Sequence, residues 1–237
     1  MQSNNHYPRY RAVGNDKKMA KPLRKTRLKS TRPRRTAHTI SDTYDKILAV
    51  AEEEFANSGY NGTSLEVIAR RTGIRKASLF HHFNSKRKIF DAVVRRIFDQ
   101  LVSIGRETAA IDNPKEHLLA IAVRLHDFVA SHPNHARLLM HRVLEDPASV
   151  RRSSEVFIKP LVIEMAQLVV RGAQMGVIRN TDGPISMTLI ALAIPILPYS
   201  FAPVVEACTG IEVFSPASIA IIRSQVMQRM DTLLSPG

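Results

Sequence analysis

Hydrogen-bonding, cationic and flat side chains are concentrated in one short segment, residues 75–82. Interrupted only by Leu79, the segment contains, in order, Arg75, Lys76, Ala77, Ser78, Phe80, His81 and His82. Guanidinium, ammonium and hydroxyl groups donate hydrogen bonds to phosphate oxygens and base edges, and flat rings lie against sugars, phosphates or thymine methyl groups. The chemistry that this segment favours is therefore recognition of a nucleic acid.

Three further polar residues lie where the sequence predicts the starts of helices, namely Thr63, Ser64 and Lys86. The first turn of a helix has free amide donors and a positive dipole end, and both attract anions. We therefore expect these side chains to contact phosphates. An ordinary solvated lysine is the alternative interpretation of Lys86.

Motifs of common enzyme classes are missing from the sequence: it has no G-x-S-x-G, no P-loop, no dinucleotide-binding glycine motif and no H-E-x-x-H. The sequence therefore predicts neither an enzyme nor a cofactor. His132 and His135 are spaced as two metal ligands could be, but no cysteine or carboxylate pair accompanies them, so we expect no metal site. The single cysteine, Cys208, is expected to be a small buried residue, with a redox sensor as the alternative.

Two short helices joined by a tight turn are predicted to carry the nucleic-acid-binding side chains. Thr63 and Glu66 have the spacing of a capping box, which opens a helix that Gly73 closes. The second short helix covers residues 76–82. Such a pair is typical of a helix-turn-helix, here over about residues 64–83, in which the second helix enters the major groove.

The rest of the chain has helical periodicity, and no useful window alternates with the period of a strand. A first helix is expected to be capped by Ser41 or Asp42 and to end at Asn57-Ser58-Gly59. Proline, glycine and Asn/Asp breaks separate the later helices. These are predicted at residues 85–104, 114–131, 133–145, 147–175 (with a kink at Pro160), 184–201 and 216–234. The fold class is all-α, with about nine helices.

Positive charge is concentrated at the N-terminus. Residues 1–40 contain twelve lysines and arginines and one aspartate, while the whole chain has a formal net charge of +13. A basic tail on a nearly neutral body is typical of an arm that binds a polyanion. Arg32, Arg34 and Arg35 are expected to lie in a minor groove. A tail that binds nothing is the alternative interpretation of this segment. The sequence also leaves open whether translation starts at Met1 or at Met19.

Residues 183–205 carry no charge, and 23 residues are long enough to cross a bilayer. The segment also contains Pro184, Pro195, Pro198 and Pro203, whose missing hydrogen bonds lipid could not replace. Lysines and arginines do not cluster at its ends. The sequence therefore predicts a helix buried in protein and no membrane partner.

Between about residues 42 and 100, many residues share one pattern: they are Ile47-Leu48-Ala49, Ala51, Phe55, Gly59-Tyr60, Thr63-Ser64, Ile68-Ala69, Gly73-Ile74, Leu79-Phe80-His81-His82-Phe83 and Ser85-Lys86. In type and spacing, without a gap, these residues resemble those of the TetR (tetracycline-repressor-like) family. The resemblance implies a homodimeric, usually repressing regulator that leaves DNA when a small effector binds its C-terminal domain. It also implies that residues 75–78 read bases, that residues 80–82 contact bases and backbone, and that Thr63, Ser64 and Lys86 hold phosphates.

Two positions depart from the family pattern. Phe80 replaces a common tyrosine, so a phenolic hydrogen bond to phosphate is lost and packing alone is one interpretation of its role. Arg75 occupies a position often held by a serine or threonine cap. A cation there opposes the helix dipole by about 0.3–1 kcal/mol. We interpret Arg75 as exchanging helix stability for a contact to guanine or phosphate.

The chain is thus expected to consist of a disordered basic arm (residues 1–38), a DNA-binding domain (39–85) and a helical effector-binding and dimerisation domain (86–237). The expected protein is a cytoplasmic, nucleoid-associated homodimer that binds a pseudo-palindromic double-stranded operator. An apolar or amphipathic small molecule is expected to release it. An architectural DNA-binding protein without an effector is the alternative.

Apolar side chains at helical spacing in the last domain predict an effector pocket, with plain core as the alternative. The pocket residues would be Leu125, Phe128, Met140, Val143, Phe157, Leu161, Met165 and Leu168. The last helix has a narrow apolar stripe that can pack on the proline-interrupted helix, on a second subunit, or on both. The resemblance favours a dimer interface there, formed by Ile219, Ile222, Val226, Met230 and Leu233.

Overall fold

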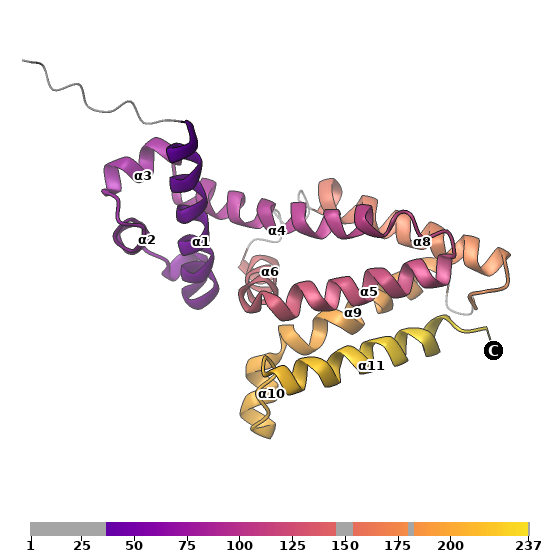
Figure 1. The fold of residues 1–237 in the computed structure, drawn as a ribbon. Coiled ribbons are helices and arrows are strands. Elements are labelled where there is room, and N and C mark those ends of the chain that lie inside the picture. The colour runs from indigo at the N-terminus through magenta and orange to yellow at the C-terminus, as the bar shows by residue number, and fades with distance from the viewer. Residues whose placement is uncertain (1–36, 146–153, 180–182, 237) are drawn as a thin grey trace, which may run out of the picture. The chain divides into compact units, whose positions relative to one another are not determined.

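The structure, a computed structural model, describes residues 37–145, 154–179 and 183–236, and the side chains at 37–41, 140–145, 154 and 157 lie outside that description. The described residues form ten α-helices, one short π-helix and no strand (Figure 1), which confirms the predicted all-α class. The helices are α1 (Ala37–Gly62), α2 (Leu65–Thr72), α3 (Lys76–His82), α4 (Lys86–Thr108), α5 (Pro114–Ser131), α6 (Pro133–Glu145), the π-helix η1 (Ser154–Ile158), α8 (Lys159–Gln174), α9 (Pro184–Ser200), α10 (Ala202–Thr209) and α11 (Pro216–Leu234).

Helices α1, α2 and α3 and the first half of α4 share one hydrophobic core, which we call the head core. Its largest buried side chains, with one from α6, are Phe55, Ile47, Ile68, Leu79, Ile89, Ile97 and Leu138. Gly59, with φ of 66°, kinks α1, so the predicted end of the first helix is a bend and the helix continues to Gly62. The predicted cap at Ser41 or Asp42 is wrong, because α1 already begins at Ala37.

A second cluster, the body core, joins α5, α8, α9 and α11 with the second half of α4. Its largest buried side chains are Leu118, Met165, Leu168, Met187 and Met230. Gly172 of α8 is pressed against Ile178, and a Cβ atom at this position would overlap the Ile178 side chain. Glycine is therefore required where the chain turns back after α8.

Local signals set most helix ends where the sequence predicts them. Asn113 caps α5 by accepting from the backbone N–H of Lys115 at 3.0 Å, and Pro114 fills the first turn. The bounds of α5, α6 and α11 are those predicted. Of the helix predicted over residues 147–175, residues 147–153 lie outside the described residues, and the rest is divided into η1 and α8, with Pro160 in the first turn of α8 and not inside one longer α-helix. Proline is compatible with a first turn because its missing N–H has no helical partner there.

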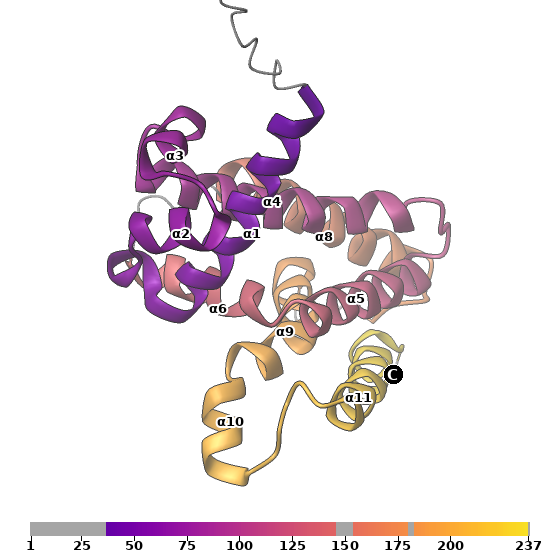
Figure 2. The same cartoon turned by 60° about the vertical axis from the view of Figure 1, so that its left-hand side comes forward.

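Helix α9 contains Pro195 and Pro198, and α10, which the sequence did not predict, follows it after a bend of 56°. Figure 2 shows that α10 points away from α9 and is connected to α11 by a loop. No single helix among the described residues is long and apolar enough to span a membrane. The bent pair of α9 and α10 reaches that length only together.

Candidate nucleic-acid interface

Helices α2 and α3 form the predicted helix-turn-helix, with the predicted ends. Gly73 closes α2 in the left-handed conformation (φ 78°, ψ 25°), and its backbone N–H donates to the carbonyl of Arg70 at 3.1 Å. Arg75 is the N-cap of α3, with extended backbone angles and no capping hydrogen bond from its side chain. The structure thus places a cation at the position where the helix dipole disfavours it.

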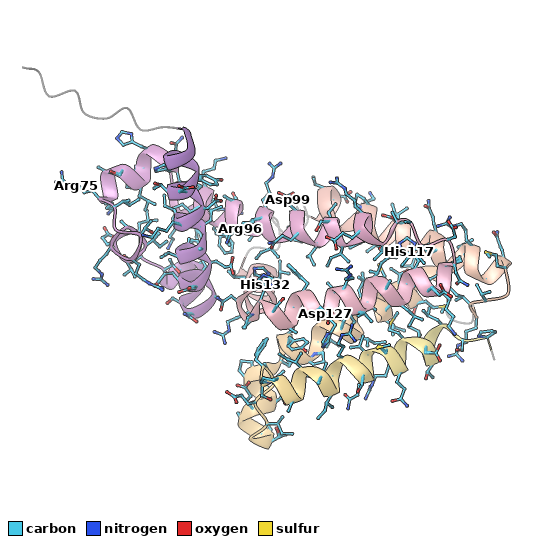
Figure 3. All side chains as sticks on the ribbon, viewed as in Figure 1. Arg75, Arg96, Asp99, His117, Asp127 and His132 are labelled. Carbon is cyan, nitrogen blue, oxygen red and sulfur yellow. The ribbon has the colours of Figure 1, made fainter. Side chains whose placement is uncertain are left out.

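Helix α3 turns one face to the head core and leaves the other accessible. Leu79 is buried in the head core. The predicted DNA-binding residues on the accessible side are exposed (Arg75, Lys76, Ala77, Phe80 and His81) or half-buried (Ser78 and His82). Figure 3 shows Arg75 at the outer edge of the head. All seven side chains can therefore reach a ligand, and their individual DNA contacts stay predictions.

Phe80 is 42% exposed, so only part of its side chain packs within the protein. Its DNA contact and the alternative role of packing alone both stay predictions. Phe83, three residues later, is buried, and its ring stacks on Tyr44 of α1 with centroids 4.9 Å apart.

Lys76 is held by an acidic residue of α2. Its ammonium group donates to Glu66 Oε1, and the hydroxyl of Ser64 donates to Glu66 Oε2 at 2.9 Å. The hydrogen bond from Lys76, followed by that from Ser64, lowers the pKa of Glu66 to about 2. The carboxylate is therefore ionised at neutral pH. A phosphate or base that binds Lys76 has to compete with it.

The predicted capping box is wrong. Ser64 and not Thr63 is the N-cap of α2, and its side chain makes no capping hydrogen bond. The Ser64 hydroxyl donates to Glu66 instead. Thr63 is only 4% exposed, and its hydroxyl lies 2.7 Å from the carbonyl oxygen of Gly59 and 3.1 Å from that of Glu54. The predicted phosphate contact of the Thr63 side chain is therefore wrong as well. Ser64 is half-buried, and its phosphate contact stays a prediction.

Lys86 binds the connection between α1 and α2. Its Nζ donates to the carbonyl oxygens of Thr63 at 3.0 Å and Asn61 at 3.2 Å, and lies 4.7 Å from the centroid of the Tyr60 ring. The structure thus excludes an ordinary solvated lysine. Lys86 fixes the start of α4 beneath the helix-turn-helix, a role that the sequence does not reveal because its partners are backbone oxygens more than twenty residues away. Its predicted phosphate contact stays a prediction.

Glu52 joins α1 to α4 and α6, and sequence reasoning missed it. One carboxylate oxygen accepts from Arg96 of α4 at 2.7 Å, and the other lies 3.1 Å from Nε2 of His135 on α6. Beside it, Arg137 of α6 donates to Asn57 of α1 at 3.2 Å. Polar contacts therefore connect α1 with both α4 and α6.

His126, His132 and His135 have partners within the protein, while the side chain of His141 lies outside the described residues. His126 is fully buried between the Asp127 carboxylate (2.9 Å) and the Tyr199 hydroxyl (2.8 Å), and burial raises the pKa of Tyr199 to about 12. The rings of His132 and His135 stack at 4.4 Å. In the described part of the chain, no three His, Cys, Asp or Glu side chains are grouped as a metal site requires. Cys208 is exposed, so its expected burial is wrong.

The residues predicted for the effector pocket do not line one cavity. Leu125, Met165 and Leu168 are buried in the body core, and the side chains of Met140, Val143 and Phe157 lie outside the described residues. Leu161 lines a hollow of about 390 Å³ between α4 and α8, together with Val102, Gly105, Arg106, Pro160 and Glu164. Phe128 lines a separate, polar hollow of about 580 Å³ between α4, α5 and α11. The prediction of one pocket from all eight residues is therefore wrong.

The predicted dimer stripe of α11 is wrong at two positions. Val226 is 2% exposed and Met230 is fully buried, both in the body core, so they contact the chain's own helices. Ile219, Ile222 and Leu233 are half-buried. The large apolar side chains exposed on α11 are instead Ile221 and Met227, and on α9 they include Ile185, Leu189 and Ile190.

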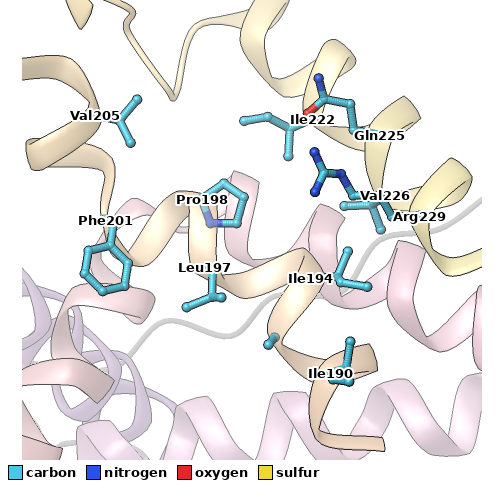
Figure 4. Close-up of a pocket in the computed structure, with 11 residues that line it drawn as sticks. Ile190, Ile194, Leu197, Pro198, Phe201, Val205, Ile222, Gln225, Val226 and Arg229 are labelled. Atoms are coloured by element: carbon cyan, nitrogen blue, oxygen red, sulfur yellow. The ribbon is translucent and has the colours of Figure 1, made fainter. Parts of the chain in front are cut away.

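Figure 4 shows a third hollow, of about 610 Å³, between α9, α10 and α11. Ile190, Ile194, Leu197, Phe201 and Val205 line it from α9 and α10, and Ile222, Gln225, Val226 and Arg229 from α11. It is thus mainly apolar. Arg32, Arg34 and Arg35, the predicted minor-groove residues, lie outside the described residues.

Comparisons with known proteins agree with this geometry. Residues 47–93 match the family model of bacterial regulatory proteins of the tetR family, and residues 114–229 match a tetracyclin repressor-like C-terminal domain. The chain is 28% identical over 178 residues to the HTH-type transcriptional regulator RutR of Escherichia coli, which covers 73% of this chain and 82% of RutR.

Two further likenesses cover different parts of the chain. The chain is 45% identical over 60 residues to IcaR, the negative regulator of the biofilm operon icaADBC in Staphylococcus aureus, and matches about a third of IcaR (25% of this chain, 32% of IcaR). A solved structure of AibR in complex with isovaleryl coenzyme A and operator DNA superposes with a TM-score of 0.66 at 21% identity, covering 82% of this chain and all of AibR. Together with the two family models, these observations show that the chain belongs to the TetR family of DNA-binding transcriptional regulators.

Proposed function

We propose that the chain is a homodimeric repressor that leaves a specific operator when a small amphipathic molecule binds its body. The main observation in support of this proposal is that α4 connects the helix-turn-helix with a hollow in the body. The helix begins at Lys86, bonded beneath the helix-turn-helix, and runs to Gly105 and Arg106 in the wall of the hollow between α4 and α8. A ligand in that hollow would press on the helix that carries the head.

The hollow between α4 and α8 suits an amphipathic ligand. Val102, Pro160 and Leu161 provide apolar contacts, and Arg106 provides a cation for a phosphate or carboxylate. Asp99 and Glu164 also line the hollow, so the anionic part of a ligand has to lie on the side of Arg106. Coenzyme A thioesters combine an acyl chain with phosphates, and AibR is described in complex with one of them. We therefore propose an acyl coenzyme A as the effector class to test first. Of the residues predicted for the effector pocket, Leu161 is the one that lines this hollow.

Dimerisation through α9 and α11 completes the proposal. Leu189 and Ile190 on α9 and Ile221 and Met227 on α11, two helices that pack on one another, are exposed apolar side chains that a partner could cover. A second copy of the chain related by a two-fold axis would cover this surface and the apolar hollow of Figure 4. Such a dimer would place two recognition helices on half-sites one turn of DNA apart, on a pseudo-palindromic operator.

The test begins with DNA that the full-length protein enriches from a random pool. Isovaleryl coenzyme A is then titrated calorimetrically into the protein with and without the enriched operator. We expect the operator to weaken ligand binding by about 5- to 150-fold, and the ligand to weaken operator binding by the same factor, because linkage is reciprocal.

Leu161→Arg should abolish ligand binding by filling the hollow, and Val170→Arg, at an exposed position of the same helix, should leave it unchanged. Equal ligand affinity in both titrations would contradict the release mechanism. A protein that enriches no sequence would instead be the architectural DNA-binding alternative.

A further inference from the structure

The polar hollow of about 580 Å³ between α4, α5 and α11 is separate from the hollow proposed for the effector. The α4 residues that line the polar hollow are Gln100, Ser103, Ile104 and Glu107. Those that line the hollow between α4 and α8 are Asp99, Val102, Gly105, Arg106 and Ala109. With about 3.6 residues per turn, the two sets lie on largely opposite faces of α4. The polar hollow therefore needs an account of its own.

Two ion pairs line the polar hollow. Arg124 of α5 lies with Nη1 3.3 Å from Oε2 of Glu107 on α4, and Arg223 of α11 donates from Nε to Oδ1 of Asp127 on α5 at 3.0 Å. The two cations and two anions balance. A ligand of one sign would meet a like charge beside each of its partners, which costs affinity. A ligand that carries one charge of each sign can pair with both.

A buried network fixes the position of Asp127. His126, which is fully buried, lies with Nδ1 2.9 Å from the same Oδ1 and with Nε2 2.8 Å from the Tyr199 hydroxyl. Burial would raise the pKa of Asp127, but the hydrogen bonds from His126 and Arg223 outweigh it and lower the pKa. The carboxylate is therefore ionised at neutral pH. Since both hydrogen bonds end on Oδ1, Oδ2 can accept from a ligand.

Arg223 provides the complementary group. Its Nε is used by Asp127, and its Nη1 lies 3.9 Å from the sulfur of Met227, which is a weak acceptor. The planar guanidinium group thus keeps strong donors for a carboxylate. Its hydrogen bond to Asp127 holds a cation and an anion side by side. We propose that the polar hollow binds a free α-amino acid, with the carboxylate of the ligand at Arg223 and its ammonium group at Asp127.

The remaining lining residues indicate which amino acids fit. Ser103, Ser131, Gln100 and His132 have neutral hydrogen-bonding side chains, and Phe128 is one of two apolar residues in the wall. A ligand with a polar, uncharged side chain would find partners there, whereas a third charge would have none of its own. The inference does not depend on the proposed effector, because the two ligands would bind on different faces of α4.

The experiment titrates each standard amino acid calorimetrically into the full-length wild-type protein. We expect saturable binding of at least one amino acid with a polar, uncharged side chain. The amine that lacks its carboxylate and the acid that lacks its ammonium group should each bind about tenfold more weakly or worse, the value of one charge-assisted hydrogen bond. Binding of no amino acid would overturn the proposal. An acid analogue that binds as tightly as the amino acid would also overturn it, because the site would then select anions.

Variants locate the bound amino acid. Arg223→Gln should weaken binding by about tenfold or more. Arg229→Gln is the matched control, because Arg229 is exposed on the same helix but does not line this hollow, and it should leave binding unchanged. Leu161→Arg, which fills the hollow between α4 and α8, should also leave it unchanged. Binding lost in Leu161→Arg and kept in Arg223→Gln would place the amino acid in the effector hollow and overturn the proposal. Circular dichroism checks that each variant is folded, and the two analogues decide the question with wild-type protein alone.

Discussion

Glu52 of α1 and His135 of α6 are in polar contact, with 3.1 Å between Oε1 and Nε2. The other oxygen of Glu52 accepts from Arg96 of α4, which Figure 3 shows where α4 passes α1. Burial alone would raise the pKa of Glu52, but the hydrogen bonds from His135 and Arg96 outweigh burial and lower it. An ionised carboxylate therefore holds three helices together.

Glu52→Gln should lower the free energy of unfolding at pH 7 by about 1–3 kcal/mol, because the amide keeps the shape but loses two charge-assisted hydrogen bonds. A carboxyl group whose pKa is lowered by folding stabilises the protein above its unfolded pKa, here the ordinary 4.5. This stabilisation disappears as the pH falls through the lower folded pKa. The gap between wild type and variant in urea denaturation should therefore shrink below about pH 4.5.

Glu53→Gln is the control for that measurement, because Glu53 is half-exposed and pairs only with the exposed Arg71. It should change the free energy of unfolding by less than about 0.5 kcal/mol. A gap between wild type and Glu52→Gln that is the same at pH 7 and in acid would show that the Glu52 charge does not contribute.

Lys86→Met should both destabilise the head and weaken DNA binding. The substitution removes the hydrogen bonds to the carbonyls of Thr63 and Asn61 and the contact with the Tyr60 ring. We expect a loss of about 1–2 kcal/mol in urea denaturation. If the ammonium group also neutralises a phosphate, the slope of log K against log salt should fall by about 0.9.

Lys88→Met, at an exposed position two residues further along α4, should leave stability unchanged. A Lys86→Met protein of wild-type stability would contradict the structural role of this lysine.

Glu66→Gln should raise affinity for random DNA. The wild-type carboxylate holds the Lys76 ammonium group and repels phosphates, whereas the neutral amide of Gln does not repel phosphates and accepts only a weaker hydrogen bond from Lys76. We expect about a fivefold gain at low salt, the value of one unit charge at about 4 Å in water. Fluorescence anisotropy on random and operator duplexes measures both affinities. Lower affinity on random DNA would mean that Glu66 instead positions Lys76 for binding.

Two substitutions on α11 separate the core from the proposed dimer interface. Met227→Glu changes an exposed side chain and should dissociate the dimer while the monomer keeps its helical circular dichroism. Val226→Asp places a carboxylate in the body core and should unfold the chain instead. Sedimentation velocity with thermal denaturation distinguishes the two outcomes. A Met227→Glu protein that sediments as a dimer would place the interface elsewhere.

Local features of the sequence were enough to predict the helix-turn-helix and the positions of most helix ends. Gly73 and the prolines at 114, 133 and 216 act through their own backbone conformations, so their effect is readable without the fold. The roles of Thr63 and Lys86 depend on backbone oxygens that only the folded chain brings near them. On α11 both faces carry apolar residues. The helical periodicity therefore predicted an apolar stripe on α11 but did not show which face of this helix packs against the body core.

Phe128 of α5 packs against the head core, the body core and a third cluster around Tyr199 and Val213. When one of the three clusters opens, Phe128 loses its contacts there and its packing against the other two is disturbed. We therefore expect the head and the body to unfold as one cooperative unit. Heating should melt them in a single calorimetric transition, and amide hydrogens of α1 and α5 should exchange with solvent through the same opening event.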